Sequence, residues 1–339
     1  MQTPGGEVPQ ISSSLGWADR MGSFKARWGI GRMHYTVEPG LYALGSPNDQ
    51  SPLLVTANYK MSFDRLRGSL RGLNVWILVL DTQGINVWCA AGKGTFGTTE
   101  LVRRIQSSGL ERIVSHRNLI LPQLSGPGVA AHEVKKLSGF KVIYGPIRAA
   151  DLPDFMKVGL KATQMMRLKT FTTWERMVLI PLELVEALKV VLLIIPLMLI
   201  ISALLGPEGF WENILRHGLL SIPALLTAVM AGAVLTPLLL PWLPGRAFSF
   251  KGLVLGLFAA AGLMASQWGN LVSWEARLEI LAWALVVLAA TAYLAMNFTG
   301  ASTYTSLSGV KKEMRWALPL QIGGCFSGLA LWISALIMA

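Results

Sequence analysis

Charged residues and cysteines are scarce in this chain of 339 residues. Asp, Glu, Lys and Arg make up 14% of it, against about 25% in an ordinary soluble domain, while 53% of the residues are hydrophobic. Two cysteines, one in each half, exclude a disulfide scaffold and also an iron-sulfur cluster held by this chain alone, because such clusters normally take four cysteine ligands. We therefore expect any cluster chemistry to come from a partner protein.

The charge is distributed unevenly along the chain. The net charge of +11 on its own would indicate a nucleic-acid partner, but residues 1–176 hold 22 Lys/Arg and 12 Asp/Glu, whereas residues 177–339 hold 8 and 7. A half this poor in charge, with apolar stretches of about 20 residues, is typical of a bundle of membrane-spanning helices. We therefore expect no nucleic-acid partner, a basic first half, and a second half surrounded by membrane lipid.

Five apolar segments in the second half are long enough to cross a membrane. Asp, Glu, Lys and Arg do not recur inside them, so the residues that usually form an ion or proton path in a transporter are missing. We expect Cys325 to be an inert residue of the membrane core. The segments are 188–205, 219–242, 252–268, 280–298 and 316–337.

The first half predicts an arm, an α/β domain and a linker. Residues 1–50 are rich in Gly, Pro and Ser and predict an extended arm with little core, including a short hairpin over Met33–Leu44. Residues 51–156 alternate apolar strands with helical patterns, which is typical of a parallel sheet covered by helices. Residues 157–187 predict a basic, amphipathic linker at the membrane surface, followed by the five-helix domain over 188–339. The expected strands are 53–57, 74–80, 119–121 and 141–144, and the expected helices are 62–70, 98–107, 129–137 and 152–156.

Sheets of this kind bind ligands at the carboxyl ends of their strands, on the loops that lead into helices. Four such loops consist largely of small or polar residues, and together they predict a binding face. They are 56–59, 81–99, 124–128 and 145–146.

Cys89 lies in the longest of these loops. From the residues alone, it is a small buried side chain, a nucleophile or a metal ligand. No obvious His or Asp base lies beside it in sequence, which disfavours nucleophilic catalysis. A single thiolate is a sufficient protein ligand only for a soft metal already held in a macrocycle. These alternatives stay open at this point.

Several segments of the first half carry a family resemblance in their order and spacing. They are Pro52–Lys60, Asp81–Gly84, Ala90–Lys93, Pro127–Gly128 and Tyr144–Pro153. Over about 100 residues they resemble the corrinoid-binding domain of the corrinoid iron-sulfur protein of the acetyl-CoA pathway. The resemblance implies a Rossmann-like α/β domain that binds a cobalamin-type corrinoid and its cobalt.

The segment Asn86–Lys93, Asn-Val-Trp-Cys-Ala-Ala-Gly-Lys, is also similar to the signature of the mercury-methylating corrinoid proteins, the HgcA family. That family has a C-terminal, all-α transmembrane domain of five helices in the cytoplasmic membrane. The resemblance implies a methyltransferase that moves a methyl group, as a carbanion equivalent, from methyl-Co(III) to Hg(II) and so forms methylmercury. Cys89 would be the lower axial ligand of cobalt, and a strong thiolate donor opposite the methyl group favours its release.

The same resemblance implies which residues hold the cofactor. Asn86 is alternatively only a helix cap, and Lys93 is either a solvated charge or a partner of the thiol or of a corrin amide. The cofactor-binding set is Thr56, Asn58, Asn86, Val87, Trp88, Cys89, Ala90, Ala91, Gly92, Lys93, Gly126, Gly128, Gly145 and Pro146.

Turnover implies partners, because returning cobalt to Co(I) after methyl transfer takes two electrons. We expect a ferredoxin-like protein with 4Fe-4S clusters, similar to HgcB, and a methyl-donor methyltransferase. The alternatives are a corrinoid methyl carrier for another acceptor, in the acetyl-CoA pathway or a metalloid, and a non-catalytic corrinoid sensor or transporter. The polar segment Asn297–Gly309 either folds toward the cofactor or is a hydroxyl-rich loop at the membrane edge.

Loop charges predict the orientation in the membrane. Loops on the side of the first half carry five Lys or Arg, whereas the opposite loops carry two Arg beside four Glu. Residues 1–16 show no secretory signal, so we expect a cytoplasmic α/β domain and an outward C-terminus. Reporter fusions at Gln2 and Ala339 should report opposite sides of the membrane. Both reporters on one side would contradict the five-span arrangement.

Overall fold

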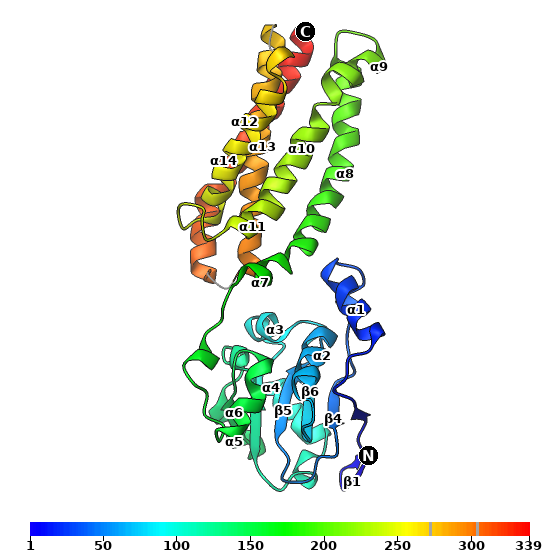
Figure 1. The fold of residues 1–339 in the computed structure, drawn as a ribbon, viewed down its shortest axis with the longest axis vertical. Helices are drawn as coiled ribbons and strands as arrows, with labels where there is room; N and C mark the ends of the chain where they lie inside the picture. The colour runs from blue at the N-terminus through cyan, green and yellow to red at the C-terminus, as the bar shows by residue number, and fades with distance from the viewer. Residues whose placement is uncertain (271–272, 303–304) are drawn as a thin grey trace. The chain divides into compact units, whose positions relative to one another are not determined.

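The computed structural model describes residues 1–270, 273–302 and 305–339. The chain separates into two compact units, Met1–Thr170 and Phe171–Ala339, which are considered one at a time (Figure 1). The first unit is an α/β domain and the second consists of helices. The order of the two units agrees with the sequence analysis, while a Rossmann-like classification and membrane crossing stay predictions.

The first unit is built on a six-stranded sheet in the order β3-β4-β6-β5-β7-β8. The strands β6, β5, β7 and β8 run parallel, as predicted, whereas β4 runs antiparallel to β6. A separate two-stranded sheet joins β1 to β2. The bounds are β1 Gln2–Thr3, β2 Gly6–Glu7, β3 Gln10–Ile11, β4 Gly40–Leu44, β5 Leu53–Ala57, β6 Val75–Leu80, β7 Asn118–Leu121 and β8 Lys141–Tyr144.

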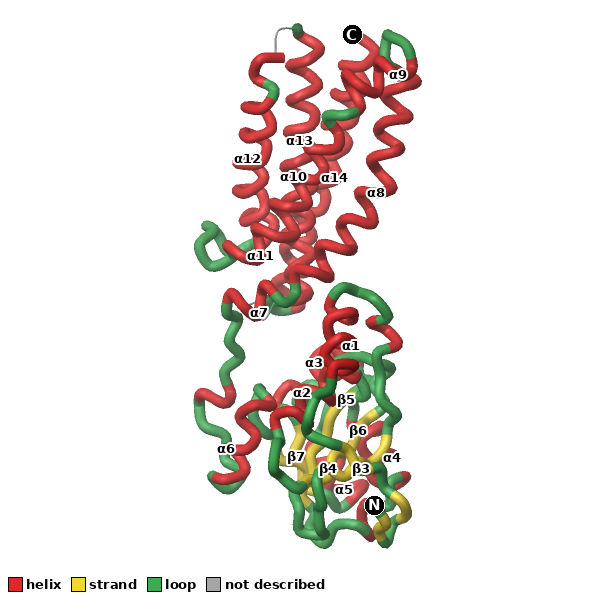
Figure 2. Tube along the Cα trace, turned by 45° about the vertical axis from the view of Figure 1, so that its right-hand side comes forward, coloured by secondary structure: helices red, strands yellow, loops and turns green. Residues whose placement is uncertain are grey.

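The central strands are apolar throughout because both faces of the sheet are covered. Along β5, Val55 faces the core formed with α4 and α5, whereas its neighbour Leu54 faces the core formed with α2 and α6. Along β6, Leu78 likewise faces the core formed with α4 and α5, and Ile77 faces the core formed with α2 and α6. Figure 2 shows the strands inside this cover of helices. The helices are α2 Lys60–Ser69, α4 Thr98–Ser107, α5 Ala131–Ser138 and α6 Leu152–Lys157.

The first 50 residues differ from the extended arm predicted from their composition. They contain a helix, α1 Trp17–Arg27, and contribute β3 and β4 to the main sheet. The hairpin predicted over Met33–Leu44 is wrong, because β4, the strand within this range, pairs with β6 on one side and with β3 on the other. Ala43 and Leu44 are buried in the domain core. A short strand among Gly and Pro residues leaves little periodic signal, which is why composition misled the prediction.

A cluster of four charged side chains connects α1 to α2. Asp19 on α1 accepts from Lys60 Nζ at 2.6 Å and pairs with Arg67 Nη2 at 2.8 Å. Asp64 on α2 binds the same two cations, at 2.6 and 2.7 Å. Burial opposes ionisation of Asp19, but the hydrogen bonds from Lys60 and Arg67 outweigh it and lower its pKa to about 2.

The second unit is a helical bundle. Within the described residues, five helical segments are long and apolar enough to span a membrane, which confirms the number predicted on length and composition: Thr173–Leu205, Phe210–Leu239, Phe248–Ser266, Trp274–Ala301 and Ser308–Met338. Their helices are α7 Thr173–Met177, α8 Ile180–Leu205, α9 Phe210–Asn213, α10 Ser221–Val229, α11 Thr236–Leu239, α12 Phe248–Ser266, α13 Trp274–Asn297 and α14 Leu307–Met338, with π-helical turns at Ile214–Gly218 and Met230–Leu235.

Small residues allow the helices of the bundle to approach closely. A Cβ at Gly252 on α12 would lie 2.8 Å from the Thr291 carbonyl oxygen on α13, and one at Gly328 on α14 would lie 2.8 Å from that of Ala282. Such close contacts at small residues are typical of helix packing in membrane bundles. Gly323 is an exception, since a Cβ there would meet nothing within 4 Å.

Two cations of the second unit, Arg176 and Lys251, are buried against helix ends. Arg176 Nε donates to the Pro237 carbonyl oxygen at 2.8 Å, and Lys251 Nζ donates to that of Leu240 at 2.7 Å. Both acceptors lie at the C-terminal end of α11, where carbonyls lack intrahelical partners and carry partial negative charge. These two residues therefore stabilise a helix end.

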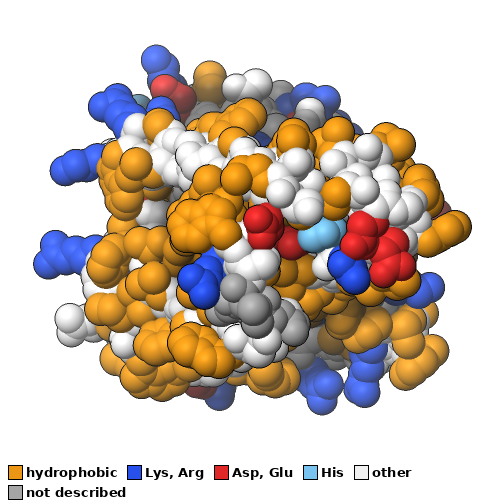
Figure 3. All heavy atoms as spheres, turned by 90° about the horizontal axis from the view of Figure 1, so that it is seen from above, with side chains coloured by type: hydrophobic (Ala, Val, Ile, Leu, Met, Phe, Trp, Pro, Cys, Tyr) orange, Lys and Arg blue, Asp and Glu red, His pale blue; other side chains and the backbone are white. Residues whose placement is uncertain are grey.

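A buried histidine-carboxylate pair connects two other segments of the bundle. His217 Nδ1 lies 3.0 Å from Glu279 Oε2, and nearby Arg216 pairs with Glu208 and Glu212. Figure 3 views the molecule from above, and hydrophobic side chains cover much of the visible surface. The charges gathered here lie at a helix end, which is where a membrane bundle tolerates them.

The Asp19 cluster predicts a pH-dependent loss of stability. A carboxyl whose pKa is lowered on folding stabilises the protein above its unfolded pKa of 3.8 and loses that effect as the pH falls toward 2. Asp19→Asn should lower the free energy of unfolding at pH 7 by roughly 1–2 kcal/mol, with a smaller difference at pH 3, in urea titrations of the α/β domain within the full chain. Asp154→Asn, which removes an exposed pair with Lys157, should cost little. An Asp19→Asn effect that is equal at both pH values would contradict the assignment.

Candidate functional site

The four predicted loops lie where a binding face of a parallel sheet forms. They follow Ala57, Leu80, Leu121 and Tyr144, the last residues of β5, β6, β7 and β8. These strands are adjacent and parallel, so their carboxyl ends share one edge of the sheet. The structure thus brings together the segments that the sequence marked as a candidate site.

Cys89 is exposed on a short helix, α3 Val87–Lys93, above this edge. The helix begins at Asn86, whose Oδ1 accepts a hydrogen bond from the Cys89 backbone N–H at 3.0 Å. Ala90 and Ala91 are buried in the domain core, so one side of α3 is anchored while the thiol faces outward. This placement excludes the interpretation of Cys89 as a small buried residue.

The other residues of the α3 segment divide by exposure. Trp88, Gly92 and Lys93 are exposed, and Val87 is half-buried against the core. Asn86 is the helix cap that the sequence left as an alternative, and it acts on the backbone of the cysteine itself. Among the described residues, no three His, Cys, Asp or Glu side chains gather into a metal site. A metal at this edge would therefore have the Cys89 sulfur as its candidate protein ligand.

Asn58 organises a loop instead of facing the open edge. It is buried, and its Oδ1 accepts from the backbone N–H groups of Thr82 and Gly84 at 3.1 and 3.0 Å. The loop contains Gln83 in the left-handed conformation with φ 57°, which such a tight turn imposes on a residue other than glycine. Thr56, predicted beside Asn58, is buried within β5. The structure therefore makes Asn58 a positioning residue for the segment that leads into α3.

Glu100 on α4 holds the same loop from the other side, a role that sequence reasoning missed. Its Oε1 accepts from the Asp81 backbone N–H at 2.9 Å, and its carboxylate pairs with Arg103 and Arg104. Burial opposes ionisation, but the Asp81 N–H and the two guanidiniums outweigh it and hold the pKa of Glu100 below its ordinary value. The i, i+3 and i, i+4 spacing predicts the arginine pairs, but no local pattern reveals the bond to Asp81.

Gly128 allows the loop after β7 to contact α3. A Cβ at this position would overlap the Phe96 carbonyl oxygen and lie 3.0 Å from Ala91 Cα. Gly145 is similarly close to Ile120, with 3.2 Å from its Cβ position to Cγ2, and Pro146 beside it is buried. Gly128 and Gly145 therefore allow close packing beneath the loops of the candidate site, where a larger side chain would not fit. Gly126, in contrast, is exposed.

The polar segment Asn297–Gly309 belongs to the second unit. Thr303 and Tyr304 within it lie outside the described residues. Among the described ones, Thr305 Oγ1 donates to the Thr299 carbonyl oxygen at 2.9 Å. The prediction that this segment reaches the cofactor stays a prediction.

Gly128 and Gly126 provide a matched test of how α3 is held. Gly128→Ala should lower the free energy of unfolding of the α/β domain by roughly 1–3 kcal/mol, because the methyl group has no space against α3. Gly126→Ala, whose Cβ would lie 3.4 Å from the Gln123 carbonyl oxygen, should change it by about 0.5 kcal/mol or less. Urea titrations of the full chain, in which proteolysis reports unfolding of this domain, measure the free energy of unfolding of both variants. Equal effects would show that the contact with α3 is unimportant.

Comparisons with known proteins concern the α/β domain. Residues 31–156 match the family described as the CO dehydrogenase/acetyl-CoA synthase delta subunit. The chain is 33% identical over 124 residues to the acetyl-CoA decarbonylase/synthase complex subunit gamma of Methanopyrus kandleri, and 30% identical over 128 residues to that of Methanocaldococcus jannaschii. These matches cover 36% and 37% of this chain, and 26% of each relative.

The matched region has clear limits. The chain spans only about a quarter of the length of these relatives, and the family match ends at residue 156, before the apolar helices. Within it lie the four loops and α3. The matches do not single out the mercury-methylating proteins. What they indicate is that residues 31–156 form a domain similar to part of these acetyl-CoA decarbonylase/synthase and CO dehydrogenase/acetyl-CoA synthase subunits.

Proposed function

We propose that this chain is a corrinoid-dependent methyl-transfer protein in which Cys89 ligates the cobalt. The observation that carries the proposal is the exposed Cys89 thiol, presented by a capped helix at the carboxyl edge of the sheet. The relatives of the domain support the cofactor class. The proposal concerns the site of the α/β domain, since the match covers this part of the chain.

The residues at the edge suit a flat macrocycle with one protein ligand. Cys89 is exposed, and a Cβ at Gly92 on the same helix would meet nothing within 4 Å, so the surface beside the sulfur is open. When bound, a cobalamin-type corrinoid would supply a methyl group on cobalt that leaves as a carbanion equivalent. Cys89 would hold the cobalt through its thiolate, a strong electron donor that favours that release.

The remaining site residues keep the sulfur in place. Asn86 fixes the first turn of α3, Asn58 and Glu100 hold the loop before it, and Gly128 sets its distance from the loop after β7. Because these contacts already fix the position of the Cys89 side chain, no ordering of the segment is needed when the metal binds. Trp88 and Lys93, exposed beside Cys89, are available for the edge of the cofactor.

For the methyl acceptor we propose Hg(II), an electrophile that takes a carbanion equivalent. Two features support it: the similarity of Asn86–Lys93 to the mercury-methylating signature, and the combination of this domain with five apolar helices. The names of the relatives favour a second candidate, a corrinoid methyl carrier of the acetyl-CoA pathway. The two candidates share the cofactor and differ in the acceptor.

Turnover also needs an electron donor. The chain has two cysteines, too few to hold a 4Fe-4S cluster by itself, so a separate ferredoxin-like protein is the proposed reductant. The basic excess of residues 1–176, with 22 Lys/Arg against 12 Asp/Glu, favours an acidic partner by electrostatic attraction. A methyl-donor methyltransferase completes the proposed set.

Replacing Cys89 tests the proposal. In the corrinoid-loaded full chain, Cys89→Ala should change the visible spectrum and slow methylmercury formation from Hg(II) by more than about a hundredfold, because losing even an outer-shell residue of a metal site costs 10–100-fold. Cys325→Ala, the matched control, should keep both the spectrum and the rate. An unchanged spectrum with full activity in Cys89→Ala would exclude the ligand role.

The acceptor is tested in the same preparation. A methyl-loaded wild-type chain, kept anaerobic and given Hg(II), should lose its methyl group and form methylmercury. Retention of the methyl group with Hg(II), but transfer to an acetyl-CoA decarbonylase/synthase complex, would support the second candidate and exclude mercury.

A further inference from the structure

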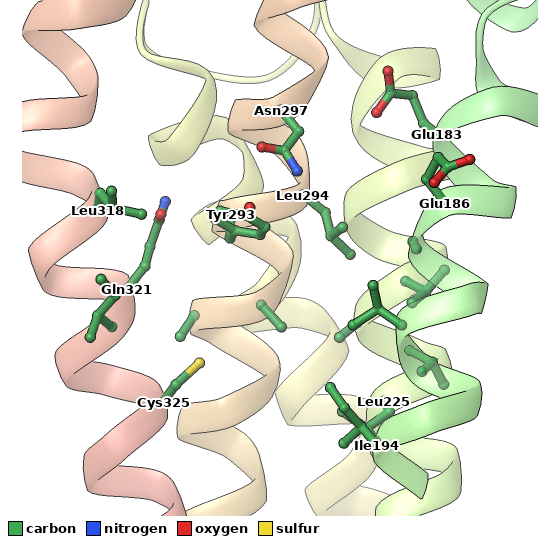
Figure 4. Close-up of a pocket in the computed structure, with 18 of the residues that line it drawn as sticks. Glu183, Glu186, Ile194, Leu225, Tyr293, Leu294, Asn297, Leu318, Gln321 and Cys325 are labelled. Atoms are coloured by element: carbon green, nitrogen blue, oxygen red, sulfur yellow. The ribbon is translucent and has the colours of Figure 1, made fainter. Parts of the chain in front are cut away.

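The helical unit contains a cavity of about 510 Å³ between α8, α10, α13 and α14 (Figure 4). This volume is typical of sites for small molecules, which measure roughly 300–1,000 Å³. Its walls are largely apolar, with Ile194, Leu225 and Leu294 among them. It lies within one unit and is separate from the Cys89 site.

One polar side chain in this wall has no partner. Gln321 on α14 is 6% exposed, and neither its Nε2 nor its Oε1 has a hydrogen-bond partner among the described residues. In Figure 4 its amide extends from α14 toward Tyr293 on α13. An unpaired donor and acceptor in an apolar environment are costly, so this amide indicates a ligand that offers one of each.

The charges around the cavity disfavour an anionic ligand. No Lys, Arg or His lines it, whereas Glu183 and Glu186 lie at one end. Glu186 already pairs with Lys189, at 2.8 Å. A phosphate or carboxylate group would therefore find repulsion and no cationic partner, which disfavours an anionic head group.

Exposure of the lining residues shows where the cavity opens. Ala228 on α10 and Ala289 on α13 are buried and form its floor. Val190 on α8 and Ile322 and Phe326 on α14 are 54%, 48% and 70% exposed. The opening therefore lies on the outer surface of the bundle, between α8 and α14. In a membrane this surface faces hydrocarbon, so a ligand would enter from the lipid.

We propose that this cavity binds one neutral, lipid-soluble amphiphile whose head group offers a hydroxyl and a carbonyl to the amide of Gln321. The apolar part of the ligand lies along α8 and α10, against Ile194 and Leu225. The proposal is independent of methyl transfer and assigns the bundle a ligand site of its own.

Cys325, which also lines the cavity, reports on its occupancy. Because the chain has two cysteines, Cys89→Ala leaves Cys325 as the sole thiol. In the full chain in detergent, 1-monooleoylglycerol should slow alkylation of Cys325 by N-ethylmaleimide, with saturation. Gln321→Leu should weaken the apparent affinity about tenfold or more, since two hydrogen bonds are lost. The control Gln106→Leu, at an exposed position of α4, should leave it unchanged.

A second measurement and a charged probe complete the test. Native mass spectrometry of the same protein should retain monooleoylglycerol, and less of it in Gln321→Leu, whatever the reactivity of the thiol. Lysophosphatidylglycerol, which adds an anionic phosphate, should protect Cys325 poorly. Equal protection by this anionic lipid, an unchanged affinity in Gln321→Leu, or no retained monooleoylglycerol would each overturn the proposal.

Discussion

The close backbone packing of α3 on the loop after β7 is the contact on which the site depends. Ala90 and Ala91 are buried, and Gly128 leaves no space for a side chain between that loop and the helix. A seven-residue helix has little stability of its own, so this tertiary contact holds it. With one side anchored, Cys89 faces outward, and the Asn86 cap bonds its backbone N–H.

Buried polar side chains have different roles in the two units. In the α/β domain, charged and polar side chains such as Asn58 and Glu100 hold the loops of one sheet edge. In the bundle, buried cations such as Arg176 bind helix ends, and the interior holds an apolar cavity in which the Gln321 amide has no partner among the described residues. The proposed polar chemistry therefore concerns the first unit, and the proposed lipid-soluble ligand concerns the second.

Sequence reasoning succeeded where a local pattern determines the structure. The strands over 53–57 and 141–144 and the helix over 98–107 have the predicted bounds, because apolar runs and helical periodicity are local signals. It failed for β4, whose pairing with β6 is a long-range contact. In the site, the cap at Asn86 was foreseen as an alternative, whereas the bond from Asp81 to Glu100 depends on tertiary structure alone.

X-ray absorption at the cobalt edge of the anaerobic, corrinoid-loaded chain tests the central claim most directly, because it identifies the atoms bound to the metal. If Cys89 is the lower ligand, the wild-type protein shows a sulfur scatterer in the first coordination shell, and Cys89→Ser lacks it while Cys325→Ser retains it. A wild-type cobalt coordinated only by nitrogen, oxygen or carbon would contradict the account.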